Sequence, residues 1–179
     1  PDGLWAEISH YGYPAGFTSQ KYLAGRGRAN YRRSMYTAWK RTSPPPAKAI
    51  VDAPNRETCT VRRLNTNTPL QALVLQNDPQ FLEAARALGA IMADAGSAAG
   101  GIESGFMRVL GRAPADGELQ LLKRALDRYR KTYLGRTADA AALTSVGESS
   151  SWISSKPELA AWTLVASTLL NMDEAVTRQ

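Results

Sequence analysis

The chain has 179 residues, of which 44% are hydrophobic and 21% charged, a composition typical of a folded globular domain and not of a disordered segment. No apolar run reaches the roughly 18 residues that a transmembrane helix needs, so we expect no membrane span. The single cysteine, Cys59, excludes an intrachain disulfide and a cysteine-based metal cluster, and we expect it to be a buried, unreactive thiol. The single histidine, His10, has no nucleophile motif around it and is not expected to be catalytic.

The net charge of +6 is concentrated in the first third of the chain. Residues 1–63 contain 11 Lys and Arg against 4 Asp and Glu, whereas residues 64–179 contain 11 against 12. A basic region of this kind attracts anions, nucleic acid or an acidic protein. No helix-turn-helix, zinc-knuckle or RNA-recognition pattern accompanies the charge, so we expect no nucleic-acid partner. Alternatively, the arginines hold the carbonyls and carboxylates of an irregular segment together.

Residues 1–63 are predicted to form a long, irregular N-terminal arm, because glycine and proline recur too often for long elements. Apolar side chains spaced four residues apart over residues 29–41 favour a short helix, although a strand over residues 34–39 fits nearly as well. The three consecutive prolines at 44–46 predict extended chain.

Residues 64–179 are predicted to form a helical body of about five helices, packed with the arm into one domain. The fold class is therefore mainly α, an irregular bundle with a long N-terminal arm. Proline opens four of the predicted helices. The five predicted helices begin at Pro69, Pro79, Ile102, Pro114 and Pro157. The first three end near Gln76, Ala93 and Leu110.

Two of these helices have clear N-terminal signals. Thr68 and Gln71 flank Pro69 at the spacing of a capping box, and Asp78 stands directly before Pro79 as an N-cap. Apolar side chains at helical spacing then predict the buried faces. These faces are Phe81, Leu82, Ala85, Leu88, Ile91 and Met92; Leu119, Leu122, Leu126, Tyr129 and Tyr133; and Leu159, Trp162, Ala166, Leu169 and Leu170.

Two small-residue segments are predicted to be loops. Residues 96–101 connect two helices, and the Ala-, Ser- and Gly-rich segment 136–153 contains an exposed loop over residues 146–152. Trp152 stands in that loop, where a large apolar side chain often belongs to a contact surface. The alternative is that Trp152 packs under the loop.

The candidate ligand or interface surface combines basic and aromatic side chains of the arm. Arginine suits carboxylates, sulfates and phosphates, whereas aromatic faces suit sugar rings or cations. The alternative is that the aromatic side chains anchor the arm on the helices and the arginine stems cover them. The surface consists of Arg32, Arg33, Tyr36, Trp39, Arg41, Arg56, Arg62 and Arg63.

Carboxylates provide the basis for an enzymatic alternative. Asp52, Glu57 and Asp173 are the candidate acid–base groups of an active site shared with a preceding domain. General acid–base catalysis needs two carboxylates at a defined distance and with perturbed pKa values. A sequence shows neither the distance nor the pKa values. Arg56, Arg62 and Arg63 lie close in sequence to Asp52 and Glu57, so ion pairing within the arm is the preferred interpretation. We predict no catalytic residue and no metal ligand.

Nine sequence blocks together resemble one family. They are Gly3–Trp5, Tyr31–Thr42, Ser43–Pro46, Asp52–Cys59, Arg62–Arg63, Thr66–Leu73, Asn77–Phe81, Glu158–Trp162 and Leu169–Glu174. These blocks resemble the planctomycete cytochrome-associated C-terminal domain family, domain of unknown function 1553. Segment 136–156 resembles it least.

The resemblance implies a context and no catalytic residues. Family members are large exported proteins in which a cytochrome c-like segment and another domain precede this one. The resemblance therefore implies an extracytoplasmic location and partners among the other domains of the parent chain. We expect Pro1 to be a cut inside such a protein. The chain lacks a Cys-x-x-Cys-His haem-attachment motif, so haem is expected only in another domain. The leading interpretation is a non-catalytic helical accessory module, and binding of an anionic glycan is the third alternative.

Overall fold

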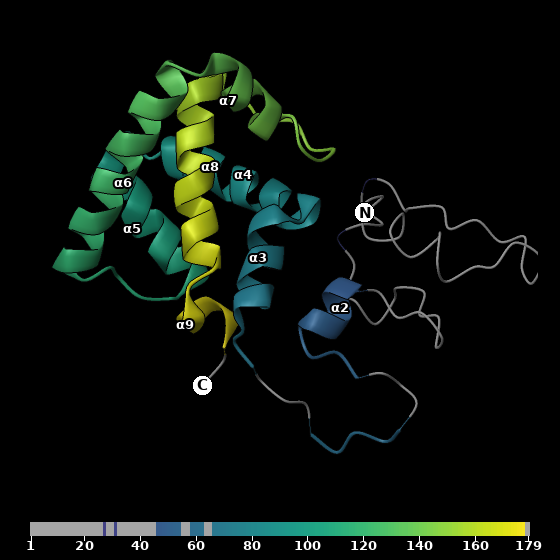
Figure 1. The fold of residues 1–179 in the computed structure, drawn as a ribbon. Helices are drawn as coiled ribbons and strands as arrows, with labels where there is room; N and C mark the ends of the chain where they lie inside the picture. The colour runs from purple at the N-terminus through teal and green to yellow at the C-terminus, as the bar shows by residue number, and fades with distance from the viewer. Residues whose placement is uncertain (1–26, 28–30, 32–45, 55–57, 63–65, 178–179) are drawn as a thin grey trace, which may run out of the picture. The chain divides into compact units, whose positions relative to one another are not determined.

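The computed structural model describes residues 27, 31, 46–54, 58–62 and 66–177, and within these residues it contains helices and no strand (Figure 1). The mainly α prediction is confirmed, although eight helices are found among the described residues where about five were expected. They are α2 (Pro46–Ile50), α3 (Pro69–Asn77), α4 (Pro79–Ala93), α5 (Ala98–Val109), α6 (Asp116–Leu134), α7 (Thr137–Thr144), α8 (Lys156–Leu170) and α9 (Asp173–Val176).

The chain divides into two compact units, Pro1–Val74 and Leu75–Gln179. The first unit includes α2 and most of α3, and the second contains α4 to α9. The helix or strand predicted over residues 29–41 lies outside the described residues, apart from Tyr31. The boundary predicted at residue 63, within a single domain, stays a prediction.

The predicted N-terminal signals of α3 and α4 are confirmed. The Thr68 amide donates to Gln71 Oε1 at 2.9 Å, and the Gln71 amide donates to Thr68 Oγ1 at 3.2 Å, which is the reciprocal pair of a capping box. At α4, the Gln80 amide donates to Asp78 Oδ1 at 2.8 Å, and the helix runs from Pro79 to Ala93 as predicted. Side-chain acceptors thus satisfy backbone donors that have no partner within the helix.

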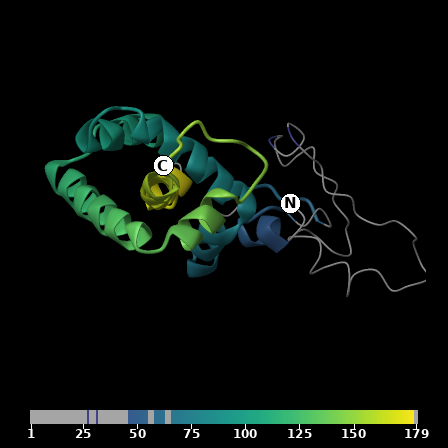
Figure 2. The same ribbon diagram turned by 90° about the horizontal axis from the view of Figure 1, so that it is seen from above.

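Helix α8 forms the centre of the second unit. It packs against α4, α5, α6, α7 and α9, most extensively against α4. Figure 2 shows α8 nearly end-on, with α4, α5, α6 and α7 around it. Its buried residues occupy nearly every side of the helix, as is typical of a central core helix. They are Leu159, Ala160, Ala161, Trp162, Thr163, Val165, Ala166 and Leu169.

Glycines allow α4 and α5 to approach α8 closely. A Cβ atom on Gly101 would lie 2.4 Å from the Met92 carbonyl oxygen and 2.6 Å from Trp162 Cη2. A Cβ atom on Gly89 would lie 2.8 Å from the Thr163 backbone nitrogen. Real Cβ contacts are essentially never this short, so the helices pack at a distance that only glycine permits.

The predicted loop at 96–101 is partly wrong, and one helix was missed in the Ala-, Ser- and Gly-rich segment 136–153. Helix α5 begins at Ala98, four positions before the predicted Ile102, with Ser97 Oγ accepting from the Gly100 amide at 3.0 Å. Helix α7 occupies residues 137–144, where no helix was predicted. Small residues suggested loops in both places, but in α5 the buried Gly101 and Gly105 are packing residues.

The predicted apolar face of α4 is also partly wrong. Ala85 and Met92 are buried as predicted, but Phe81 is 38% exposed. The charged side chains of Glu83 and Arg86 are buried in its place. The α4 face that contacts its neighbours is therefore rotated relative to the most apolar one. The faces predicted for α6 and α8 hold better, since Leu122, Leu126, Leu159, Trp162, Ala166 and Leu169 are all buried.

The close approach at Gly101 generates a prediction. Replacing Gly101 by Ala should destabilise the protein by about 1–3 kcal/mol, because α5 must move away from Met92 and Trp162. Gly117→Ala is the matched control, since a Cβ atom there meets nothing within 4 Å. The control should be neutral or stabilising by up to about 1 kcal/mol, because alanine favours helix. Urea denaturation of both variants measures this, and equal stabilities would contradict the packing role.

Candidate functional site

Of the eight residues in the predicted basic-aromatic surface, the structure describes one, Arg62. Arg62 lies in an irregular segment and is exposed. The other seven residues of that surface lie outside the described residues, so the surface stays a prediction. They are Arg32, Arg33, Tyr36, Trp39, Arg41, Arg56 and Arg63. The prediction that Cys59 is buried is wrong: its thiol is free and exposed, because residues 58–62 form an irregular segment whose side chains all face solvent.

Asp52 has a local role in the first unit. Its backbone lies in the left-handed region at φ 59°, which aspartate tolerates better than most residues. Its Oδ2 accepts from the Thr66 amide at 2.9 Å, from Thr66 Oγ1 at 2.6 Å and from Gln71 Nε2 at 3.2 Å. The buried Gln71 side chain also donates to the Ile50 carbonyl at 2.8 Å. Asp52 and Gln71 therefore connect the end of α2 to the start of α3.

The other two candidate acid–base groups do not join Asp52 in a described site. Glu57 lies outside the described residues. Asp173 is exposed at the start of α9, where its Oδ1 accepts from Thr177 Oγ1 at 3.0 Å. Across the part of the chain that the structure describes, no three His, Cys, Asp or Glu side chains gather in a way that could hold a metal ion. Nor is any helix there long and apolar enough to cross a membrane.

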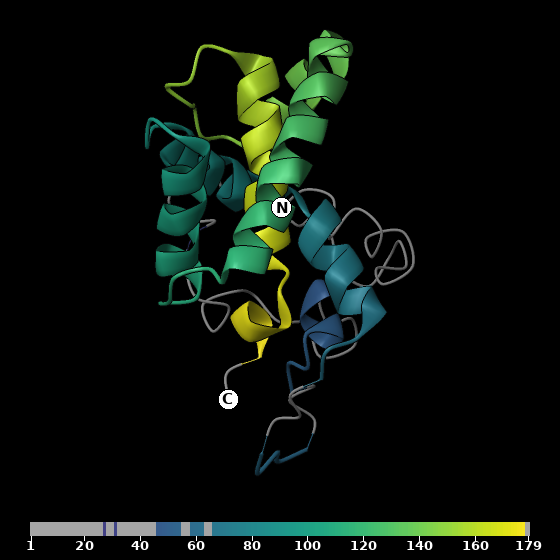
Figure 3. The same cartoon turned by 90° about the vertical axis from the view of Figure 1, so that its left-hand side faces the viewer.

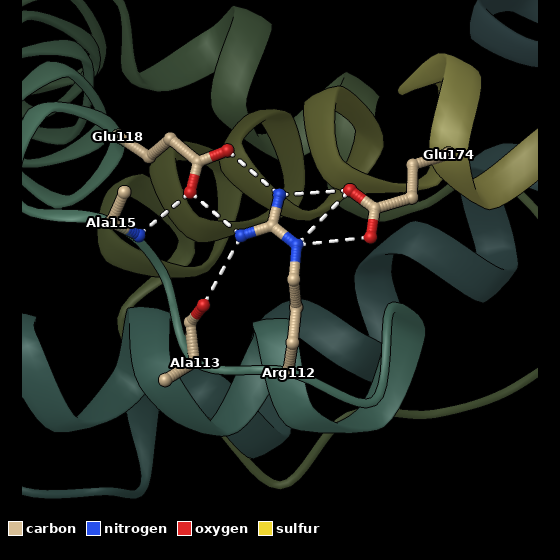
Figure 4. A network of polar contacts seen from close by, with 5 residues as sticks. All are labelled: Arg112, Ala113, Ala115, Glu118 and Glu174. Carbon is tan, nitrogen blue, oxygen red and sulfur yellow. Dashed lines mark hydrogen bonds and ion pairs between the residues drawn. The ribbon is translucent and has the colours of Figure 1, made fainter.

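Arg112 connects three segments of the second unit (Figure 4). Its guanidinium donates to both carboxylate oxygens of Glu118 at 2.8 Å and to those of Glu174 at 2.8–3.1 Å. Arg112 also donates to the Ala113 carbonyl at 3.1 Å, and Glu118 Oε2 accepts from the Ala115 amide at 2.7 Å. One planar side chain thus holds the α5–α6 turn, the first turn of α6 and α9 together.

This network lowers the pKa of both carboxyl groups. Hydrogen bonds from Arg112, followed by the one from the Ala115 amide, lower the pKa of Glu118 to about 2. The hydrogen bonds from Arg112 likewise lower the pKa of Glu174. In return, the two carboxylates raise the pKa of Arg112. Both glutamates are therefore ionised at neutral pH and hold no proton to donate.

A second ion pair joins α6 to α8. Arg130 donates to Glu158 at 2.5–3.1 Å, and Trp162 Nε1 donates to Glu158 Oε1 at 2.8 Å. The guanidinium also lies 5.8 Å from the centroid of the Trp162 ring, within cation–π range. The hydrogen bonds from Arg130 lower the pKa of Glu158, so this carboxylate also stays ionised.

The buried pair Glu83 and Arg86 anchors the loop that follows α7. Arg86 donates to the carbonyls of Thr144 at 2.6 Å, Val146 at 2.5 Å and Ser149 at 2.6 Å, and also to Ser149 Oγ at 2.8 Å. Glu83 Oε1 accepts from the Ser149 amide at 2.5 Å and lies 3.9 Å from Arg86. Both side chains are more than nine-tenths shielded from solvent. Irregular backbone is thereby held to α4 by buried hydrogen bonds.

The anchored loop presents Trp152 to solvent. Gly147 adopts φ 86°, and a Cβ atom there would lie 2.6 Å from the Glu83 carboxylate, so the loop packs directly on the anchor. Three residues after Ser149, the Trp152 side chain is 61% exposed. The exposed loop predicted at 146–152 is confirmed. The alternative that Trp152 packs under the loop is wrong.

Sequence reasoning missed the anchor itself. Glu83 and Arg86 stand three residues apart, a spacing that is equally typical of a solvent-exposed ion pair. The partners of Arg86 are backbone carbonyls about 60 residues further along the chain. Every residue has a carbonyl, so residue types do not indicate which ones Arg86 binds. The Ser- and Gly-rich composition did indicate the loop, but not what holds it.

A comparison with protein families identifies the chain. A family model described as PSD1, protein of unknown function (DUF1553), matches residues 6–126, about two-thirds of the sequence. The chain belongs to the DUF1553 family. This confirms the resemblance drawn from the sequence blocks. Neither the curated proteins nor the solved structures gave a match.

The DUF1553 match ends within α6. It includes Arg112, Glu118 and both anchor residues, Glu83 and Arg86. The Trp152 loop, α7, α8 and α9 follow the matched residues. The DUF1553 match therefore contains the side chains that hold the loop but not the loop itself.

The anchor generates a stability prediction. Replacing Arg86 by Leu should destabilise the protein by about 3–5 kcal/mol, because it leaves Glu83 buried without its cation and three carbonyls without their donor. Arg108→Leu is the control at an exposed position of α5, with an expected change within about 0.5 kcal/mol. Urea denaturation measures both. Equal stabilities of the two variants would show that the pair does not anchor the loop.

The Arg112 network generates a pH prediction. A carbon NMR titration should place the Glu118 midpoint near the pKa of about 2, and Arg112→Gln should raise it toward the ordinary value of 4.5. Because the folded-state pKa is depressed, the stabilisation from this pair is present above about pH 4.5 and is lost as pH falls through about 2. A wild-type midpoint near 4.5 would contradict the network.

Proposed function

We propose that this chain is a non-catalytic interaction module that binds other domains of its own parent protein. The observation that carries the proposal is the exposed Trp152 on a loop that the buried side chains of Arg86 and Glu83 hold through hydrogen bonds. Tryptophan is among the residues that contribute most to protein interfaces. Because Arg86 and Glu83 already hold the backbone at Thr144, Val146 and Ser149, binding through the loop loses less conformational entropy than binding through a free segment.

The titration of the carboxylates supports a non-catalytic role. A general acid or base at neutral pH needs a pKa near the working pH, which for a carboxyl group means a raised pKa. Every carboxyl group with a resolved shift in the described residues has a lowered pKa instead: Glu118, Glu158 and Glu174. Each of these is bound by an arginine that connects two parts of the second unit. They act as structural counterions, and Asp52 is likewise engaged in local hydrogen bonds.

The parent protein is, by this proposal, an exported multidomain protein with a cytochrome c-like segment. The resemblance of the sequence blocks to the family supports this context. The chain is then the C-terminal part, located outside the cytoplasm, and binds no haem. Its partners are the domains that precede it.

Binding between the 179-residue chain and the separately expressed preceding domains tests the proposal. Trp152→Ala should weaken the affinity at least about tenfold, because truncating an aromatic anchor at an interface typically costs more than 1 kcal/mol. The matched control is Leu134→Ala on α6, an apolar position that is 70% exposed, against 61% for Trp152. Isothermal titration calorimetry measures the affinities of the wild-type chain and of both variants for the preceding domains. No binding by the wild-type chain, or equal losses in both variants, would contradict the proposal.

A further inference from the structure

Helix α6 carries a row of basic side chains on its outer surface. Arg124, Arg128 and Lys131 stand at spacings of four and three residues, which places them on one face of the helix. All three are exposed. At 1.5 Å per residue, the row extends roughly 10 Å along the helix axis. Figure 3 shows α6 on the outside of the second unit, in front of α8 in that view.

These three cations do not join α6 to any other described element. None of them forms an ion pair or a side-chain hydrogen bond with any residue that the structure describes. Arg86, Arg112 and Arg130 in the same unit all bind carboxylates or carbonyls. Segment 123–131 holds five basic residues against one acidic residue, Asp127, which lies 3.7 Å from Arg130.

The helix dipole accounts for only part of this charge. A cation in the last turn of a helix is stabilised by the carbonyl end of the dipole, and Lys131 is in that position. The effect falls off within one turn, so it does not extend to Arg124 or Arg128. Arg124 and Arg128 also repel each other at a spacing of four residues. Asp127 stands three residues after Arg124 and four before Lys131 and attracts both, although the ion pair that it forms among the described residues is with Arg130. Helix stability therefore explains part of the row and leaves Arg128 unexplained.

The cations, together with Asp127 and Thr132, border an open space of about 600 Å³ between side chains of α6 alone. Its surface combines polar groups with the aliphatic stems of the long basic side chains, and no aromatic residue is among those that line it. A protein interface is typically built around aromatic anchors, and a single-stranded nucleic acid requires stacking surfaces. An extended polymer with repeated anionic groups requires neither. The two guanidinium groups and the lysine ammonium can each bind one of its successive sulfates or carboxylates.

We propose that the outer face of α6 binds an anionic glycan through Arg124, Arg128 and Lys131. The ligand class is a sulfated or carboxylated polysaccharide that lies along the helix. This site goes beyond the Trp152 surface and does not depend on it. It is also separate from the basic arm at residues 1–63, whose arginines are a different set.

Heparin, a sulfated polysaccharide, is the probe for the test. The site variant is Arg124→Gln/Arg128→Gln/Lys131→Gln in the full 179-residue chain. The control variant is Arg108→Gln/Arg136→Gln/Lys156→Gln, which removes the same three charges from exposed positions on other elements. Both variants therefore reduce the net charge from +6 to +3. Thermal unfolding by circular dichroism establishes that each is folded.

The site variant should bind heparin at least about tenfold more weakly than the control variant at about 100 mM NaCl, because three localised contacts are lost. Its affinity should also depend less steeply on salt concentration. Equal weakening in the two variants would overturn the proposal in favour of attraction by net charge alone. Unchanged binding by the site variant would also overturn it. Equal or stronger wild-type binding to polyglutamate or to DNA would assign a different class of ligand.

Discussion

The second unit depends on how closely its helices can approach Trp162. This side chain is buried in α8, with Gly101 of α5 against its ring and Gly89 of α4 against its backbone. Any larger residue at these glycines forces the helices apart, since the nearest atoms belong to backbone or to a rigid ring. The same tryptophan donates to Glu158, which binds Arg130 of α6. One residue thus sets the packing of three neighbouring helices.

Local signals predicted the helices whose ends are determined locally. Thr68, Gln71 and Asp78 cap their helices through contacts within three residues, so the residue types contain the whole signal. Segment 98–101 was misread because small residues favour loops in isolation, whereas here they allow a helix to pack tightly. The face of α4 was misread for a related reason. Burial of Glu83 and Arg86 depends on a distant loop, and apolar periodicity contains no information about such a partner.

The candidate site likewise combines a feature that follows from local sequence with one that depends on distant contacts. The loop at 146–152 and its exposed tryptophan followed from composition, because glycine and serine interrupt the helical pattern there. What makes Trp152 a candidate contact is the fixed backbone beneath it, and that depends on hydrogen bonds from Arg86 to carbonyls. A sequence records which side chains can donate but not which carbonyls will be within reach. The anchor could be found only from the fold.

Arginine content is therefore a poor guide to ligand binding in this chain. Several basic residues of the second unit bind groups of the protein itself and so stabilise the fold. Arg86, Arg112 and Arg130 each bind groups distant in sequence, and their removal would loosen loops or helix ends. On the outer face of α6, the cations at 124, 128 and 131 have no such role. Lys131 gains some stabilisation from the helix dipole, but Arg124 and Arg128 have neither that benefit nor an ion pair with a described residue, which makes this face a candidate binding surface. This reasoning separates the α6 face from the other basic positions.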